Sequence, residues 1–180
     1  ASDYFSSKVL NEDLYRLKKF YFDHGFFDAR IDTIVSYDPE DKEAGVRFII
    51  YENKRYRIDS VHFSGLETIS PDALRLFTAI KKIKPGVFYD RSRIVKNSNE
   101  RLDMLQNNGY MNARLKEDSG TVIQKYDYSP KSILSVTVNF EGTDSLFYFG
   151  KTNINISSNR YGVSKELLHD QIEYKEGELY

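Results

Sequence analysis

The stretch Gly25-Phe26-Phe27-Asp28-Ala29-Arg30-Ile31 returns as Gly109-Tyr110-Met111-Asn112-Ala113-Arg114-Leu115, position for position, at a spacing of 84 residues (109 − 25). In each copy a helical pattern stops at a glycine, an aromatic residue follows, and an alternating apolar and polar run begins. Glycine takes the left-handed backbone conformation that ends a helix without a Cβ penalty. The pattern therefore predicts a helix, a glycine cap and a strand, and its long period indicates a repeated structural unit.

The composition narrows the classes of protein. The chain has 180 residues, 40% of them hydrophobic, a formal net charge of −1 and no cysteine. A chain of this size can bury one core or two small ones, and its near-neutral charge gives no overall attraction to nucleic acid or anionic lipid. The absence of cysteine excludes disulfides and thiolate metal sites. We also expect no transmembrane helix and no signal peptide within this sequence, because it has no run of 18 apolar residues and no charged-then-apolar amino terminus.

Before the first copy, Leu10, Leu14, Leu17 and Phe20 recur at spacings of three and four, which predicts a helix over residues 7–24. Alternation after Gly25 predicts strands over residues 27–37 and 46–51, joined by a polar turn. Two strands with a short connection favour an antiparallel hairpin.

The central part of the sequence predicts a strand, two helices and two further strands. The first strand covers residues 55–64 and closes at Gly65. Ser70 followed by Pro71 is typical of a helix start, and the second helix, residues 91–108, has Ile94, Val95, Leu102 and Leu105 as its expected buried stripe. Strands are then expected at residues 111–116, with a continuation through 122–126, and at 133–140.

The cycle begins again near Leu146. A strand is expected from Tyr148 to Ile156, and Ser164 is expected to cap a short helix. The closing Gly177-Glu178-Leu179-Tyr180 matches Gly86-Val87-Phe88-Tyr89 at a spacing of 91 residues (177 − 86). We therefore expect the second half of a unit at residues 1–54, a complete unit at 55–142 and the first half of another at 143–180.

This repeat resembles the POTRA (polypeptide-transport-associated) module of the BamA and TamA class of outer-membrane assembly proteins, a surface-antigen family. The first half unit departs from the family pattern in having Glu52-Asn53 where Glu-Gly is common. The residues that carry the resemblance are Gly25, Gly65, Gly86, Tyr89, Gly109, Tyr110, Ala113, Glu141, Gly142, Gly177 and Tyr180.

The resemblance implies an α+β fold of tandem β-α-α-β-β modules, each a three-stranded mixed sheet covered by two helices. It implies a non-enzymatic periplasmic arm, the soluble part of an outer-membrane protein, that needs no cofactor. Such an arm would bind unfolded outer-membrane or exported polypeptides and periplasmic or lipoprotein accessory subunits, and would pass clients to a membrane barrel on the same full-length chain. The POTRA region of a two-partner-secretion transporter is an alternative within the family.

In the family, the strand after the Gly-Tyr pair is an edge strand, and an unpaired edge can add a strand from another chain by β-augmentation. The residues implied for this client-binding edge are Met111, Asn112, Ala113, Arg114, Leu115 and Lys116, with Phe27, Ala29 and Ile31 in the earlier copy. Phe26, Phe27, Tyr110 and Met111 could line a client groove, although aromatic residues after a glycine cap more often lie in the core.

Other kinds of site find little support. His24, His62 and His169 show no ligand spacing, and His24 is better explained by the helix dipole. Lysines 81, 82 and 84 with Arg91 and Arg93 form the densest basic cluster, so a nucleic-acid-binding α/β module is the main rival from another class, and an uncharacterised enzyme is a third possibility. A cluster at a solvated helix end explains these cations better. The two half units also leave open that two molecules complete each other's unit.

Overall fold

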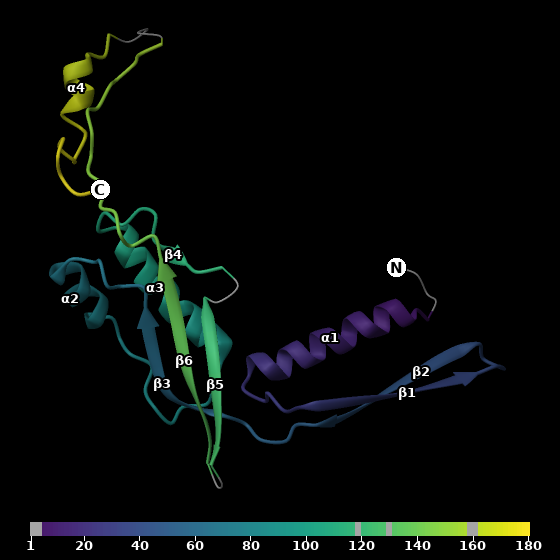
Figure 1. The fold of residues 1–180 in the computed structure, drawn as a ribbon. Coiled ribbons are helices and arrows are strands. Elements are labelled where there is room, and N and C mark those ends of the chain that lie inside the picture. Colours follow the sequence, from purple (N-terminus) through teal and green to yellow (C-terminus); the bar gives the residue numbers. More distant parts are fainter. Residues whose placement is uncertain (1–4, 118–119, 129–130, 158–161) are drawn as a thin grey trace. The chain divides into compact units, whose positions relative to one another are not determined.

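The structure is a computed structural model, and it describes residues 5–117, 120–128, 131–157 and 162–180. Figure 1 shows the elements in these ranges. They are helix α1 (Ser7–Asp23), strands β1 (Arg30–Asp38), β2 (Glu43–Tyr51) and β3 (Arg57–Ser64), helices α2 (Pro71–Ala79) and α3 (Arg91–Gln106), strands β4 (Arg114–Leu115), β5 (Thr121–Tyr128) and β6 (Lys131–Glu141), and helix α4 (Lys165–His169).

Two sheets are present in the described part of the chain. Strands β1 and β2 pair antiparallel from Arg30 opposite Tyr51 to Asp38 opposite Glu43. In the second sheet β6 is central: β3 pairs with it on one side, and β4 and β5 both pair with it as well. The mixed α+β fold with helices and sheets is the fold class that the sequence implied.

The chain divides into two compact units. The first consists of residues 1–62, 82–97 and 121–137, and the second of residues 63–81, 98–120 and 138–180. Strands β3 and β6 and helix α3 contribute residues to both units, so the division does not follow the ends of the repeat.

Each unit has its own set of buried apolar side chains. Strand β6 alternates buried and partly exposed residues, as expected of a sheet with one face on a core. In the second unit, the rings of Phe63, Phe77 and Phe140 pack within 5.3–6.3 Å of one another, centroid to centroid. The buried apolar residues of the first unit are Ile31, Tyr56, Ile58, Tyr89, Ile94, Leu134 and Val136, and those of the second include Ile69, Ala73, Phe77, Leu105, Tyr110, Ala113, Val138 and Phe140.

The glycine caps are confirmed, but the strands do not follow them directly. Gly25 and Gly109 have φ angles of +90° and +88°. A tight turn follows each glycine: the N–H of Ala29 donates to the Phe26 carbonyl at 3.2 Å, and the N–H of Ala113 donates to the Tyr110 carbonyl at 2.9 Å. The strand starts expected at residues 27 and 111 are therefore wrong, because these turns use the backbone groups that a strand would need.

Two further expectations are corrected. The alternation over residues 148–156 does not form a strand in the described structure; Tyr148 makes only an isolated bridge with Leu179. A strand requires a continuous partner, and periodicity alone does not supply one. In α3, Ile94 and Leu105 are buried as expected, but Val95 is 42% exposed and Leu102 is half-buried. Asn97, Ser98 and Arg101 complete the buried face.

Candidate functional site

The edge of the second sheet carries the strand that the repeat singled out. Arg114 and Leu115 of β4 lie opposite Glu141 and Phe140 of β6, and the Arg114 guanidinium pairs with the Glu141 carboxylate at 2.9 Å. The Lys116 N–H donates to the Asn139 carbonyl at 3.0 Å. Among the described residues, β6 is the one strand that pairs with β4 or β5, so β4 and β5 together form one side of the sheet.

The other residues expected at this edge have different surroundings. Met111 and Asn112 lie exposed in the turn before β4, whereas Ala113 is buried. The Tyr110 ring is also buried, and its hydroxyl accepts a hydrogen bond from the Ser70 N–H at 2.7 Å. Tyr110 is thus a core residue that holds the start of α2.

In the earlier copy, the corresponding residues lie against the first unit's core. Ile31 is buried in β1, Ala29 closes the turn, and Phe27 packs between Tyr56 and Tyr89, with ring centroids 5.6 and 5.0 Å away. The structure therefore places Phe27 in an aromatic cluster, and only Ile31 of the three within a strand.

A set of backbone hydrogen bonds joins the cap of α1 to the start of β3, and we call it the first joint. The Tyr56 N–H donates to the Gly25 carbonyl at 2.9 Å, and the Tyr89 N–H donates to the Tyr56 carbonyl at 3.0 Å. Two more bonds connect Ile58 to Val87 and Gly86 at 2.8 and 2.7 Å. A Cβ on Gly25 would lie 3.1 Å from the Tyr89 carbonyl oxygen, so this close approach also favours glycine.

The second joint, within the second unit, repeats these four bonds. Phe147 donates to the Gly109 carbonyl at 2.8 Å, and Tyr180 donates to the Phe147 carbonyl at 3.1 Å. Phe149 then takes the place of Ile58, with bonds of 2.9 and 2.8 Å to Glu178 and Gly177. The repeated glycines and tyrosines of the sequence thus meet in space at two equivalent backbone arrangements.

Side chains add polar contacts to the first joint. One Asp28 carboxylate oxygen accepts a hydrogen bond from Lys125 Nζ at 2.7 Å, and the other accepts one from the Tyr56 hydroxyl at 2.8 Å. The Lys125 hydrogen bond, with help from that of Tyr56 and from the charges of Lys125 and Lys54, holds the pKa of the Asp28 carboxyl below its usual value despite partial desolvation. Burial raises the pKa of the neighbouring Tyr89 hydroxyl to about 12, so this phenol stays neutral at ordinary pH.

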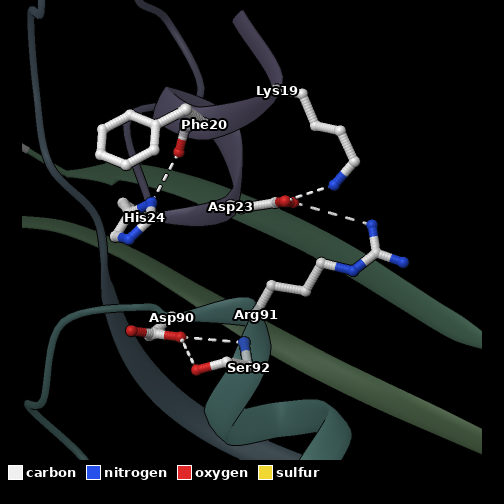
Figure 2. A network of polar contacts seen from close by, with 7 residues as sticks. All are labelled: Lys19, Phe20, Asp23, His24, Asp90, Arg91 and Ser92. Atoms are coloured by element: carbon white, nitrogen blue, oxygen red, sulfur yellow. Dashed lines mark hydrogen bonds and ion pairs between the residues drawn. The ribbon is translucent and has the colours of Figure 1, made fainter. Parts of the chain in front are cut away.

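A second polar group connects the end of α1 with the start of α3 (Figure 2). The Asp23 carboxylate lies between Lys19, with which it forms an ion pair, and Arg91, whose Nη1 is 3.7 Å away. Asp90 caps α3 by accepting hydrogen bonds from the Ser92 hydroxyl at 2.5 Å and from the Ser92 N–H at 2.8 Å. The hydroxyl bond above all holds the pKa of the Asp90 carboxyl below its usual value.

At the second joint, the corresponding positions of the repeat do not carry these carboxylate and hydroxyl groups. Asn107 and Asn112 lie 84 residues after Asp23 and Asp28 and correspond to them in the repeat. Phe147 lies 91 residues after Tyr56 and corresponds to it. The two joints therefore share their backbone bonds, but the residues of the Asp28 and Asp23 contacts occur at the first joint only.

No sequence pattern predicted a role for Asp28, Lys125 or Arg101. Asp28 lies inside the repeated phrase, and the change from Asp28 to Asn112 between the copies was a signal that could have drawn attention to it. Arg101 is 1% exposed, with its guanidinium 4.4 Å from the Phe63 ring centroid and its Nη2 bonded to the Ile80 carbonyl. No sequence pattern distinguishes this buried arginine from the solvated cations of the same helix.

The described residues also bear on two other features, a metal site and a membrane-spanning helix. In the described ranges, no three histidine, cysteine or acidic residues lie together as a metal site would require. None of the helices that the structure describes has the length and apolar character needed to cross a bilayer.

Comparison with known proteins identifies the family. The family model described as POTRA, surface antigen variable number repeat, matches residues 1–53 and 56–142. A curated relative, the outer membrane protein assembly factor BamA of Buchnera aphidicola subsp. Acyrthosiphon pisum (strain APS), is 27% identical over 177 residues, which are 98% of this chain and 27% of the relative. The chain thus spans about a quarter of that relative's length.

One solved structure, of BamA POTRA domains 3–5, shows the same fold. The crystal structure of Haemophilus influenzae BamA POTRA3-5 has a TM-score of 0.51 and 18% identity, and the match covers 99% of this chain and 66% of that one. A structure of Haemophilus ducreyi BamA lacking POTRA domains 1–3 has a TM-score of 0.47 and 15% identity, over 78% of this chain and 24% of the other. With the family model matching well over half of its residues, the chain belongs to the POTRA family.

Proposed function

We propose that this chain is part of the periplasmic arm of an outer-membrane protein assembly factor, in which it binds client polypeptides or accessory proteins. The family membership and the BamA relative support this role. We also propose that its POTRA units run over residues 1–54, 55–142 and 143–180, with the first and last being parts of units. The recurrence of the joint hydrogen bonds at the matching positions supports this division.

The observation that carries the binding proposal is the edge formed by β4 and β5. Both strands pair with β6, and the described structure places no strand on their other side. The outward backbone groups of an edge strand can bond to an added strand, and main-chain bonding accepts many sequences. Such a surface suits a protein that receives many different unfolded chains.

The hydrogen bonds identify which backbone groups face outward. The Lys116 N–H bonds to Asn139, and the Asn139 N–H bonds to the Gly120 carbonyl, so Lys116 and Gly120 face β6. Because backbone groups alternate along a strand, the N–H groups of Leu115 and Thr121 face away from β6. A proline at Arg114 or Lys116 would consequently disrupt the sheet itself, and Leu115 and Thr121 are the informative positions.

Proline variants at these positions test the proposal. Leu115→Pro or Thr121→Pro removes one outward N–H while leaving the bonds to β6 in place, and Leu115→Ala and Thr121→Ala are matched controls that keep the N–H. Binding would be followed by photo-crosslinking to a strand-forming peptide derived from an outer-membrane protein. We expect crosslinking to fall about five- to tenfold in the proline variants, because each loses roughly one hydrogen bond to the peptide. In the alanine variants it should stay within about twofold of the parent.

The same peptide with alternate backbone nitrogens methylated is the second control. It keeps every side chain but cannot complete a ladder, so β-augmentation requires that it bind poorly. Equal crosslinking of the proline variants and the parent, or of the methylated and unmethylated peptides, would refute main-chain recognition at this edge.

A further inference from the structure

A basic cavity lies within the first unit, at the start of β3 and β6. Its volume is about 610 Å³, and four cationic side chains line it, those of Lys54, Arg55, Arg57 and Lys131. Among the described residues of the lining, Asp59 is the one that is acidic. None of these residues belongs to the β4 and β5 edge of the proposed function, so the cavity is a separate feature.

The two arginines of the cavity are held in place by the first joint. The Arg57 guanidinium lies 3.7 Å from the centroid of the Phe88 ring, and its Nη1 donates to the Gly86 carbonyl at 2.6 Å. The Arg55 guanidinium lies 4.4 Å from the same ring, and its Nε donates to the His24 carbonyl at 3.0 Å. Stacking and backbone bonding reduce the rotamer freedom that an anionic ligand would otherwise have to restrict.

The remaining donors of these arginines are available for a ligand. Each guanidinium has five N–H groups in a fixed fork, and the bonds to Gly86 and His24 use one in each case. The Lys131 side chain makes no hydrogen bond or ion pair with another described residue, and it is exposed. The excess of positive charge in a confined space favours an oxyanion.

We propose that this cavity binds an acidic segment of a polypeptide, through carboxylates placed against Arg57, Arg55 and Lys131. The proposal rests on the proposed function, since it names a class of partner for the same arm. A volume of about 610 Å³ accommodates several side chains and far exceeds one phosphate group. The lining also includes Ile58, Ile133, Asp59, Ser132 and Gly86, which suit a peptide, since a peptide brings apolar groups and N–H donors along with its carboxylates.

The test is binding of short fluorescent peptides to the 180-residue chain, followed by fluorescence anisotropy. One peptide alternates glutamate with leucine, and its control replaces each glutamate with glutamine. We expect the glutamate peptide to bind at least about tenfold more tightly at low ionic strength, and less so as salt is added. Lys131→Glu should weaken its binding about tenfold, because this change replaces an attraction by a repulsion without removing any contact within the described structure.

Lys96→Glu is the matched control, since it makes the same charge change at an exposed position of α3 outside the cavity. Its affinity should stay within about twofold of the parent, and circular dichroism checks that both variants fold. Equal binding of the two peptides, or equal effects of Lys131→Glu and Lys96→Glu, would overturn the proposal. It would also be overturned if anionic lipid vesicles or inorganic phosphate displaced the peptide more than chloride does at equal ionic strength.

This experiment separates the cavity from the edge. If Leu115→Pro and Thr121→Pro leave the glutamate peptide bound while Lys131→Glu releases it, the cavity proposal stands even if β-augmentation at the edge is refuted. Release by the edge variants but not by Lys131→Glu would assign acidic-peptide binding to the edge and refute the cavity.

Discussion

The close approach of β3 and β6 at Gly65 gives a sharp stability prediction. Gly65 has a φ of +77°, and a Cβ built on it would lie 1.9 Å from the carbonyl oxygen of Phe140. The Gly65 carbonyl also accepts a hydrogen bond from Thr143 Oγ1 at 2.6 Å. Gly65→Ala therefore forces the backbone next to β3 away from that of β6, at the place where Thr143 ties the two strands together.

The magnitude follows from two separate contributions. An alanine in the left-handed region costs about 1–2 kcal/mol wherever it stands. Relieving the clash requires the strand ends to separate by about 1 Å, since real Cβ atoms essentially never approach closer than 3.0 Å. Losing the Thr143 bond and disturbing the packing of Phe140 adds about 2–3 kcal/mol, so Gly65→Ala should lower the free energy of unfolding by about 3–5 kcal/mol.

Gly86→Ala is the matched control. Gly86 has a similar φ of +84°, but a Cβ there would have no atom within 4 Å. This variant pays only the backbone cost, about 1–2 kcal/mol. Urea unfolding of both variants, followed by circular dichroism, measures the difference. If Gly65→Ala is destabilised no more than Gly86→Ala, the close approach of Gly65 and Phe140 is not a determinant of stability and the reasoning fails.

Two further predictions concern the first joint. Asp28→Asn, which installs the residue found at Asn112, should lower the free energy of unfolding by about 1 kcal/mol, a value reduced by solvent screening because the Asp28 side chain is 40% exposed. Because the pKa of Asp28 is lowered in the folded state, its contribution to stability is present above the unfolded pKa and is lost as pH falls through the folded pKa. Below about pH 4, the urea midpoint should therefore decline more steeply with falling pH in the parent than in Asp28→Asn. Parallel curves for the two proteins would contradict the contact. Tyr89 has a pKa raised to about 12, so its contribution is complete below the unfolded value of about 10 and is lost as pH rises from about 10 to 12. Tyr89→Phe should reduce the decline of the unfolding free energy with pH over this range by the share of one titrating group. Unfolding at several pH values measures that decline, and an unchanged slope of free energy against pH would show that Tyr89 does not titrate in this window.

Much of the fold could be predicted from local patterns. The sequence predicted the helix caps at Gly25 and Gly109, the Ser70 cap of α2 and the order of elements in the complete unit. They depend on residues close together in sequence, such as the Ser70 side chain that accepts from the Ala73 N–H at 3.2 Å. The strand starts were wrong because the turns ending at Ala29 and Ala113 carry the same apolar and polar alternation as a strand.

The candidate sites were less accessible from the sequence. The edge residues were placed by resemblance, but which of their N–H groups face outward depends on the pairing with β6. In that pairing Lys116 and Gly120 both bond to Asn139, which periodicity cannot show. The basic cavity was not predicted, because its cations come from the segment before β3, from the first residue of β3 and from the start of β6, and a different basic cluster is the densest in the sequence.

By itself, the sequence determined that a unit repeats, where its helices end and which glycines and tyrosines correspond. These properties follow from local backbone preferences and from spacing along one chain. Only the tertiary structure decided which distant residues meet. At the first joint Asp28 contacts Lys125 across 97 residues, and Tyr56 and Tyr89 converge on Gly25; in the second unit Arg101 is buried against Phe63. Contacts of this kind depend on how distant segments pack, and the two copies of the phrase show the difference directly, because they keep the same backbone bonds while the side chains around them have changed.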